Sequence, residues 1–91
     1  MRARVTRVVL DVLKPRELDT TELGRALCEL EGVEKVEVSV VEVDVRTETL
    51  KLTVEGGSVD LGAVQRLLEE HGCAVRSVDA LSFEKARPGA G

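Results

Sequence analysis

The chain alternates extended, valine-rich segments with two helical segments, and this order restricts its fold more than any other feature of the sequence. Apolar side chains recur at every second position in the extended segments and every three or four positions in the helical ones. The pattern predicts strands over residues 5–13, 33–45, 49–55 and 73–83 and helices over residues 20–31 and 61–71. The predicted order of elements is therefore βαββαβ.

Each predicted helix has a residue that can cap it and a glycine that can end it. Asp19 is expected to cap the first helix, with Glu22 completing a capping box, and Gly32 to end it in a left-handed conformation. Asp60 and Gly72 have the same roles in the second helix. The apolar stripes expected to pack on the sheet are Leu23, Ala26, Leu27 and Leu30 in the first helix and Leu61, Val64, Leu67 and Leu68 in the second.

The second predicted strand changes phase in its middle. Its valines fall into two sets of opposite parity, namely Val36, Val38 and Val40, then Val41, Val43 and Val45. One face of a sheet cannot hold both sets, so a bulge is expected at Val40–Val41, followed by a turn over residues 46–48. The core residues expected on the other strands are Thr6, Val8, Leu10 and Val12, then Leu50, Leu52 and Val54, then Val75, Val78 and Leu81.

This order of elements predicts a ferredoxin-like α+β sandwich. Each β-α-β unit needs a right-handed crossover. Two such units joined by a hairpin give a four-stranded antiparallel sheet in the order 4-1-3-2, with both helices on one face. The 91 residues leave room for one domain, which we assign to residues 1–83. Residues 84–91 are expected to form a flexible tail because they have nothing to bury.

Composition argues against several partners. The chain has no Trp, Tyr or Asn and a single Phe, and its net charge is −4, so neither base stacking nor attraction to a phosphate backbone is expected. The one basic cluster, Arg2, Arg4 and Arg7, is interpreted as solvated arginines rather than a nucleic-acid arm. Cys28 and Cys73 form no C-x-x-C pair, and no signal peptide or membrane span is recognised. We therefore expect a cytoplasmic protein with reduced thiols and no membrane partner.

Three acidic residues gather near the predicted hairpin: Glu42, Asp44 and Glu48. Converging oxygen ligands are what Ca²⁺ or Mg²⁺ requires, particularly if a neighbouring subunit adds more, so these residues are the predicted metal ligands. The alternative is a solvated acidic strand face, partly neutralised by Arg46 and Lys51. No nucleophile or histidine accompanies the carboxylates, so we do not expect a catalytic pair.

Lys14 and Arg16 flank Pro15 just before the first helix. Helix N-termini attract anions, and two adjacent cations strengthen that attraction, so this segment is a candidate site for a small anion. No glycine lies there to let backbone amides approach a phosphate. The alternative is therefore a solvated turn.

Three short motifs resemble the archaeal family of unknown function numbered 211. They are VLDVLKP at residues 9–15, ELEGV at 29–33 and E-x-D-x-x-T-E-x-L-K-x-T-x-E-G at 42–56. The resemblance implies a ferredoxin-like fold in a cytosolic protein that assembles with itself, and it carries over no catalytic residue. The polar positions it shares, which become candidate binding residues, are Asp11, Lys14, Glu42, Asp44, Glu48, Lys51 and Glu55.

These features predict a non-enzymatic binding or regulatory module that forms a homo-oligomer. The valines on both parities of the second strand, an unpaired sheet edge, are expected to meet a neighbouring copy. A small ligand, a divalent cation or a small anion is expected at the subunit interfaces, with Asp11, Lys14, Arg16 and Lys51 as binding residues. The alternatives are a small metal-dependent enzyme with a carboxylate site between subunits and a nucleic-acid binder that uses the arginine cluster.

Overall fold

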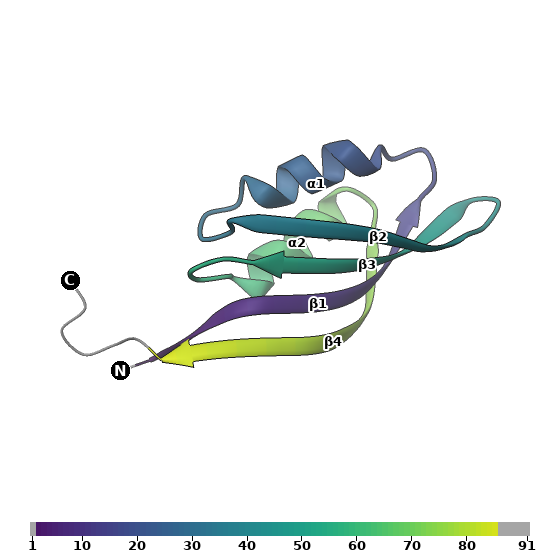
Figure 1. Ribbon diagram of the computed structural model, residues 1–91. Coiled ribbons are helices and arrows are strands. Elements are labelled where there is room, and N and C mark those ends of the chain that lie inside the picture. Colours follow the sequence, from purple (N-terminus) through teal and green to yellow (C-terminus); the bar gives the residue numbers. More distant parts are fainter. Residues whose placement is uncertain (1, 86–91) are drawn as a thin grey trace.

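The computed structural model describes residues 2–85 and contains the predicted elements in the predicted order (Figure 1). The elements are β1 (Ala3–Pro15), α1 (Thr20–Cys28), β2 (Lys35–Val43), β3 (Thr47–Glu55), α2 (Leu61–Glu70) and β4 (Ala74–Lys85). The strands form one antiparallel sheet in the order β2-β3-β1-β4, which is the expected order counted from the other edge. The ferredoxin-like α+β fold is therefore confirmed.

Both helices cover the same face of the sheet, and the core lies between the two layers (Figure 1). Leu10 and Leu52 are register partners at the centre of the sheet, and both are fully buried. The helices contribute Leu23 and Leu27 from α1 and Val64 and Leu68 from α2. Burial of each such side chain stabilises the fold by about 1.5–3 kcal/mol, so the predicted apolar stripes are what fixes the helices on the sheet.

The predicted caps are present at both helices. The Asp19 carboxylate accepts a hydrogen bond from the Thr21 amide at 2.9 Å, and Asp60 accepts one from the Ala63 amide at 3.2 Å. Gly72 has a φ of +82° and ends α2 as expected. Gly32 has a φ of +85°, but α1 already ends at Cys28 and a turn separates the two residues. A side chain at Gly32 would collide with the Ser58 carbonyl oxygen, so close backbone packing also requires this glycine.

The bulge predicted in the second strand is present. The register between β2 and β3 shifts between Val40 and Glu42, which leaves Val41 without a partner. The shift turns Glu42 to the same face as Thr49, its partner on β3. The hairpin turn covers residues 44–46 rather than 46–48, because the Asp44 amide donates to the Thr47 carbonyl and extends the pairing.

Three expectations about β1 and β4 are wrong. Val78 and Leu81 of β4 are 41% and 42% exposed, and of the three expected anchors only Val75 packs against the core. Both side chains face the helix side, opposite Leu10 and Val8, but they are exposed there because β4 is an edge strand. On β1 a register shift leaves Thr6 unpaired, and Val5 rather than Thr6 packs against the core. Strand β4 also continues to Lys85, two residues into the expected tail, and residues 86–91 lie outside the described part of the chain.

Within residues 2–85, neither helix has the length and apolar character needed to cross a membrane.

Candidate functional site

The face of the sheet that carries no helix is polar along most of its length, and we call it the open face. On β3, Lys51 is exposed and projects to the open face as expected, between the core residues Leu50 and Leu52. On β1, Asp11 projects to the same face. Acidic and basic side chains alternate here, and one ion pair, Arg76–Asp11, joins β4 to β1 on the open face.

A hollow of about 340 Å³ lies on the open face near the hairpin end of the sheet. We call it the open-face hollow, and its lining residues are Asp11, Val41, Glu42, Thr49, Leu50, Lys51, Arg76 and Asp79. They come from all four strands, so the sheet as a whole shapes the hollow. Three of the residues singled out from the sequence are among them: Asp11, Glu42 and Lys51.

The centre of the open-face hollow is a charge pair. The Arg76 guanidinium lies 3.2 Å from Asp11 Oδ1 and donates a long hydrogen bond of 3.5 Å to Thr49 Oγ1. Lys51 is the register partner of Asp11 on the neighbouring strand. Asp11 therefore has Arg76 of β4 as its ion-pair partner and Lys51 of β3 as its register neighbour.

Register shifts explain why Arg76 and Asp79 line the hollow. Each is the extra residue where the pairing of β4 with β1 shifts, at Asp11/Val12 and at Val9/Leu10. Val41 has the same position in the bulge of β2. Bulges aim side chains away from regular alternation and are common beside functional sites. Arg76 and Asp79 were not predicted as site residues, because the apolar pattern of the last strand marked only Val75, Val78 and Leu81 as anchors. The three-residue spacing of those anchors was the signal that could have indicated one bulge residue in each interval.

Several charges in the open-face hollow have no ion-pair partner. Within residues 2–85, no opposite charge lies within 4.0 Å of the Glu42, Lys51 or Asp79 side chains. Asp79 accepts a hydrogen bond from the Ser77 hydroxyl at 2.7 Å. Charged groups of both signs are thus available to a bound molecule, with a fixed ion pair between them.

The structure separates the three predicted metal ligands. Glu42 lies on the open face, Asp44 lies in the exposed hairpin loop, and Glu48 projects to the helix side of the sheet. Across residues 2–85, no group of three or more His, Cys, Asp or Glu side chains is placed to hold a metal ion. One chain by itself does not bring Glu42, Asp44 and Glu48 to a common point.

The cations of the predicted anion site contact the protein itself. Lys14 is 1% exposed, and its ammonium donates to the carbonyls of Leu18 at 2.5 Å and Pro15 at 2.8 Å. It also lies 3.1 Å from Glu48 Oε1. This contact is an ion pair and not a hydrogen bond. Within the described part of the chain, the buried Oε1 atom of Glu48 accepts no hydrogen bond. We call Lys14 and Glu48 the sealed pair.

Arg16 holds the hairpin. Its guanidinium donates long hydrogen bonds to the carbonyls of Asp44 and Val45, and its backbone amide donates to the Arg46 carbonyl at 3.0 Å. The segment that precedes α1 therefore fastens the tip of the β2–β3 hairpin. In this arrangement Arg16 and the sealed pair are structural, and they lie apart from the open-face hollow.

Both cysteines are free thiols, one exposed and one buried. Burial raises the pKa of the Cys73 thiol, and the Lys14 ammonium partly offsets that rise. Cys28 lies on the exposed side of α1, away from the buried Leu23 and Leu27. The two thiols are thus placed to differ in reactivity.

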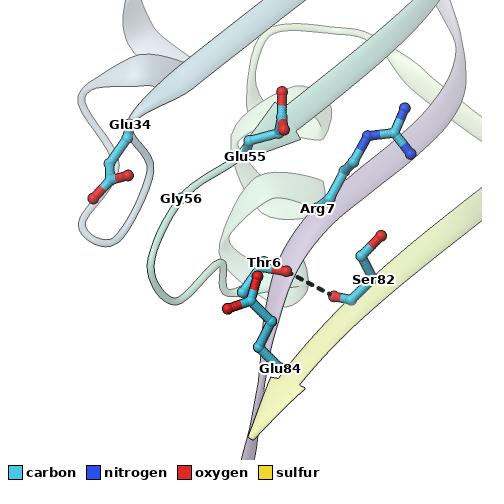
Figure 2. Close-up of a pocket in the computed structure, with 7 residues that line it drawn as sticks. All are labelled: Thr6, Arg7, Glu34, Glu55, Gly56, Ser82 and Glu84. Carbon is cyan, nitrogen blue, oxygen red and sulfur yellow. Dashed lines mark hydrogen bonds between the residues drawn. The ribbon is translucent and has the colours of Figure 1, made fainter. Parts of the chain in front are cut away.

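A second hollow of about 350 Å³ lies at the other end of the sheet (Figure 2). Thr6 donates a hydrogen bond of 3.4 Å to the Ser82 carbonyl there. The carboxylates of Glu34, Glu55 and Glu84 point in different directions in Figure 2, with no common centre. Diverging carboxylates do not make a ligand site, so the open-face hollow is the better candidate.

Comparisons with known proteins agree with the family that the three motifs indicate. The model of the family described as uncharacterized ArCR, domain of unknown function 211, matches residues 6–86. The uncharacterized protein MJ0319 of Methanocaldococcus jannaschii is 36% identical over 75 residues, which cover 82% of this chain and 77% of that protein. The match spans nearly all of the six elements, and it confirms the resemblance inferred from the three motifs. The chain belongs to the family of domain of unknown function 211.

Proposed function

We propose that this protein is a non-enzymatic, self-assembling binding module whose ligand site is the open-face hollow. The observation that supports this most directly is the placement of bulge residues. Three of the four register shifts among the described strands place their extra residue at the rim of this hollow: Val41, Arg76 and Asp79. The fourth leaves Thr6 beside the second hollow. Sheets retain such irregularities where a side chain must be re-aimed, because each one sacrifices backbone pairing.

The chemistry of the lining supports binding rather than catalysis. The side chains are carboxylates, cations, one threonine and two aliphatic groups, and the Asp11 carboxylate already pairs with Arg76. A general base is effective when it is free to take a proton from a positioned nucleophile. Charges arranged in pairs instead suit recognition of a charged small molecule. The reduced thiols Cys28 and Cys73 support a cytoplasmic location.

Self-assembly is supported by the two edges of the sheet. Val41 is 66% and Val45 86% exposed at the hairpin end of β2, and Val40 and Val43 are also exposed there. On the opposite edge, β4 exposes Val78, Leu81 and Phe83. Edge strands with unpaired N–H and C=O groups and apolar side chains are ready to pair with another chain. Because β2 and β4 run antiparallel, β4 of one copy can continue the antiparallel order with β2 of the next.

The free energy gained by burying apolar side chains must exceed the cost of association for an oligomer to form. Burial of one valine contributes on the order of 1.5 kcal/mol at ~25 cal/mol per Å². Association costs roughly 4–15 kcal/mol in lost translational and rotational freedom. The free energy gained by burying the exposed valines of one edge is close to the lower bound of that cost. Backbone hydrogen bonds between paired edges add to this gain. We therefore expect an oligomer at micromolar concentration.

Light scattering after gel filtration tests the assembly. The wild-type protein should show a mass well above 9.9 kDa at micromolar concentration. Val43→Lys, which places a charge on the exposed hairpin patch, should lower that mass. Thr21→Lys on the exposed side of α1 is the matched control and should leave it unchanged. A monomeric wild-type protein would contradict the proposed assembly.

Thermal denaturation tests the binding site. Calcium, magnesium, inorganic phosphate and free amino acids are each added at millimolar concentration. A compound that binds the folded state raises the melting temperature by mass action. A rise caused by phosphate or an amino acid should disappear in Arg76→Ala and persist in Arg4→Ala, which removes an exposed arginine ion-paired to Glu84 at the other end of the sheet. If that rise survives Arg76→Ala, the phosphate or amino acid binds elsewhere.

A further inference from the structure

The charges of the open-face hollow alternate from strand to strand. From β2 to β1 the order is Glu42, Lys51 and Asp11, and β4 adds Arg76 at its bulge. Lys51 and Asp11 are register partners on strands about 4.8 Å apart. Glu42 faces Thr49 and lies diagonally from Lys51, at roughly 7–8 Å for such neighbours. A bound molecule that lies across the strands therefore meets negative and positive charge in turn.

The free charges in this row are a carboxylate and an ammonium on neighbouring strands. Asp11 and Arg76 satisfy each other at 3.2 Å, whereas Glu42 and Lys51 have no ion-pair partner within residues 2–85. Thr49 lies on β3, as Lys51 does, and is the register partner of Glu42. Its hydroxyl oxygen accepts a hydrogen bond from Arg76. The hollow thus offers one acceptor for a cationic group and, beside it, one cation and one hydroxyl for an anionic group.

We propose that the ligand is a small zwitterion, a free α-amino acid with an aliphatic side chain; this rests on the proposed function of the open-face hollow. Its ammonium pairs with Glu42, and its carboxylate pairs with Lys51 and accepts from Thr49. Its aliphatic side chain packs on Val41, which is exposed at the rim. The hollow, at about 340 Å³, is at the small end of the range for ligand sites, which suits a molecule of this size.

Ligands of a single charge fit the hollow less well. A divalent cation requires oxygen ligands that converge on one point, and no three acidic, histidine or cysteine side chains do so within residues 2–85. A free anion meets three carboxylates, Asp11, Glu42 and Asp79, against two cations. Only a molecule that carries both signs uses Glu42 and Lys51 together.

Thermal denaturation of the full chain with matched probes tests this inference. Leucine is compared with 4-methylpentanoate, which lacks the ammonium, and with isopentylamine, which lacks the carboxylate. In tenfold excess over its Kd, leucine should raise the melting temperature by roughly 5–10 °C. Each analogue should have less than a third of that effect, because each leaves one charge of the hollow unpaired.

Variants locate the effect. Glu42→Gln and Lys51→Met should each abolish the leucine shift. Lys35→Met is the matched control, because Lys35 lies opposite Glu55 at the other end of the same face, and it should retain the shift.

Three outcomes would overturn the inference: no shift with any aliphatic amino acid, a shift equal for leucine and one analogue, or a shift unchanged by Lys51→Met. Suppose that leucine leaves the melting temperature unchanged, whereas calcium or phosphate raises it in the wild type but not in Glu42→Gln or Lys51→Met. That result would overturn only the proposal that the ligand is an amino acid. The proposed function of the hollow would then stand. If no probe shifts the melting temperature and the protein is a monomer, both proposals fail.

Discussion

The strand pair β1–β3 carries two lysine–carboxylate pairs in direct register, on opposite faces of the sheet. Lys14 faces Glu48 on the helix side, and Asp11 faces Lys51 on the open side, three residues along. In sequence the two pairs look alike. In the structure Lys14 of the first pair is buried against Glu48, whereas Asp11 and Lys51 line the open-face hollow.

The difference comes from what covers each face. The chain between β1 and α1 turns over Lys14, and the carbonyls of Pro15 and Leu18 accept from its ammonium. No element covers Lys51, so water solvates its charge. A buried charge pair is costly to break because the remaining charge loses its compensation, whereas an exposed pair is worth little. The sealed pair therefore stabilises the fold, whereas Lys51 is exposed and has no ion-pair partner within residues 2–85.

The largest expected effect follows from breaking the sealed pair. Lys14→Ala leaves the Glu48 carboxylate without its buried partner and two carbonyls without a donor. Such a change is expected to lower the free energy of unfolding by about 3–5 kcal/mol, measured by urea denaturation. Lys51→Ala on the open face is the matched control, with an expected loss below about 1 kcal/mol. Equal losses in the two variants would show that the faces do not differ as described.

A smaller effect concerns pH and the thiol beside the sealed pair. Burial raises the pKa of Cys73 in the folded protein, so the unfolded chain loses this proton first as pH rises. The stability linked to this group is present below the ordinary thiol pKa and is lost as pH rises from there toward the raised folded value. Urea denaturation from pH 7 to pH 10 should therefore show a steeper decline for wild type than for Cys73→Ala. Cys28→Ala, at the exposed thiol, should decline as wild type does, and a wild-type curve parallel to that of Cys73→Ala would contradict the assignment.

The smallest expected effect is at the centre of the open face. Asp11→Asn removes the partner of Arg76 at a site that is half exposed. The loss of stability should be about 0.2–1 kcal/mol at low salt. It should shrink further at 1 M salt, where the Debye length is about 3 Å. A loss that is large and insensitive to salt would mean that the open face is covered in the native assembly.

The sequence predicted the parts of the fold that depend on local pattern and spacing. Periodicity identified every helix and strand, and the capping residues Asp19 and Asp60 marked where the helices begin. The change of valine parity predicted the bulge beside Val41. The errors in the core lie on β4, where Val78 and Leu81 face the helix side but are exposed at the edge of the sheet, and on β1, where Val5 replaces Thr6.

The candidate site was predicted only in part. Asp11, Glu42 and Lys51 line the open-face hollow. All three are among the polar positions that the family motifs marked as candidate binding residues. Arg76 and Asp79 were missed, because bulges in a distant strand bring them to the hollow. Whether two strand residues share a hollow depends on the register between strands, and no local pattern encodes that register.

The sequence by itself determined the order of elements, where the helices begin and most of the core, because hydrophobic periodicity and capping act over a few residues. The tertiary structure alone decided which charges are buried and which are exposed. Lys14 and Lys51 belong to similar sequence patterns, and only the chain segment over one face and the solvent over the other separate them. Burial is a property of the assembled layers, and the cost of a charge is set by burial.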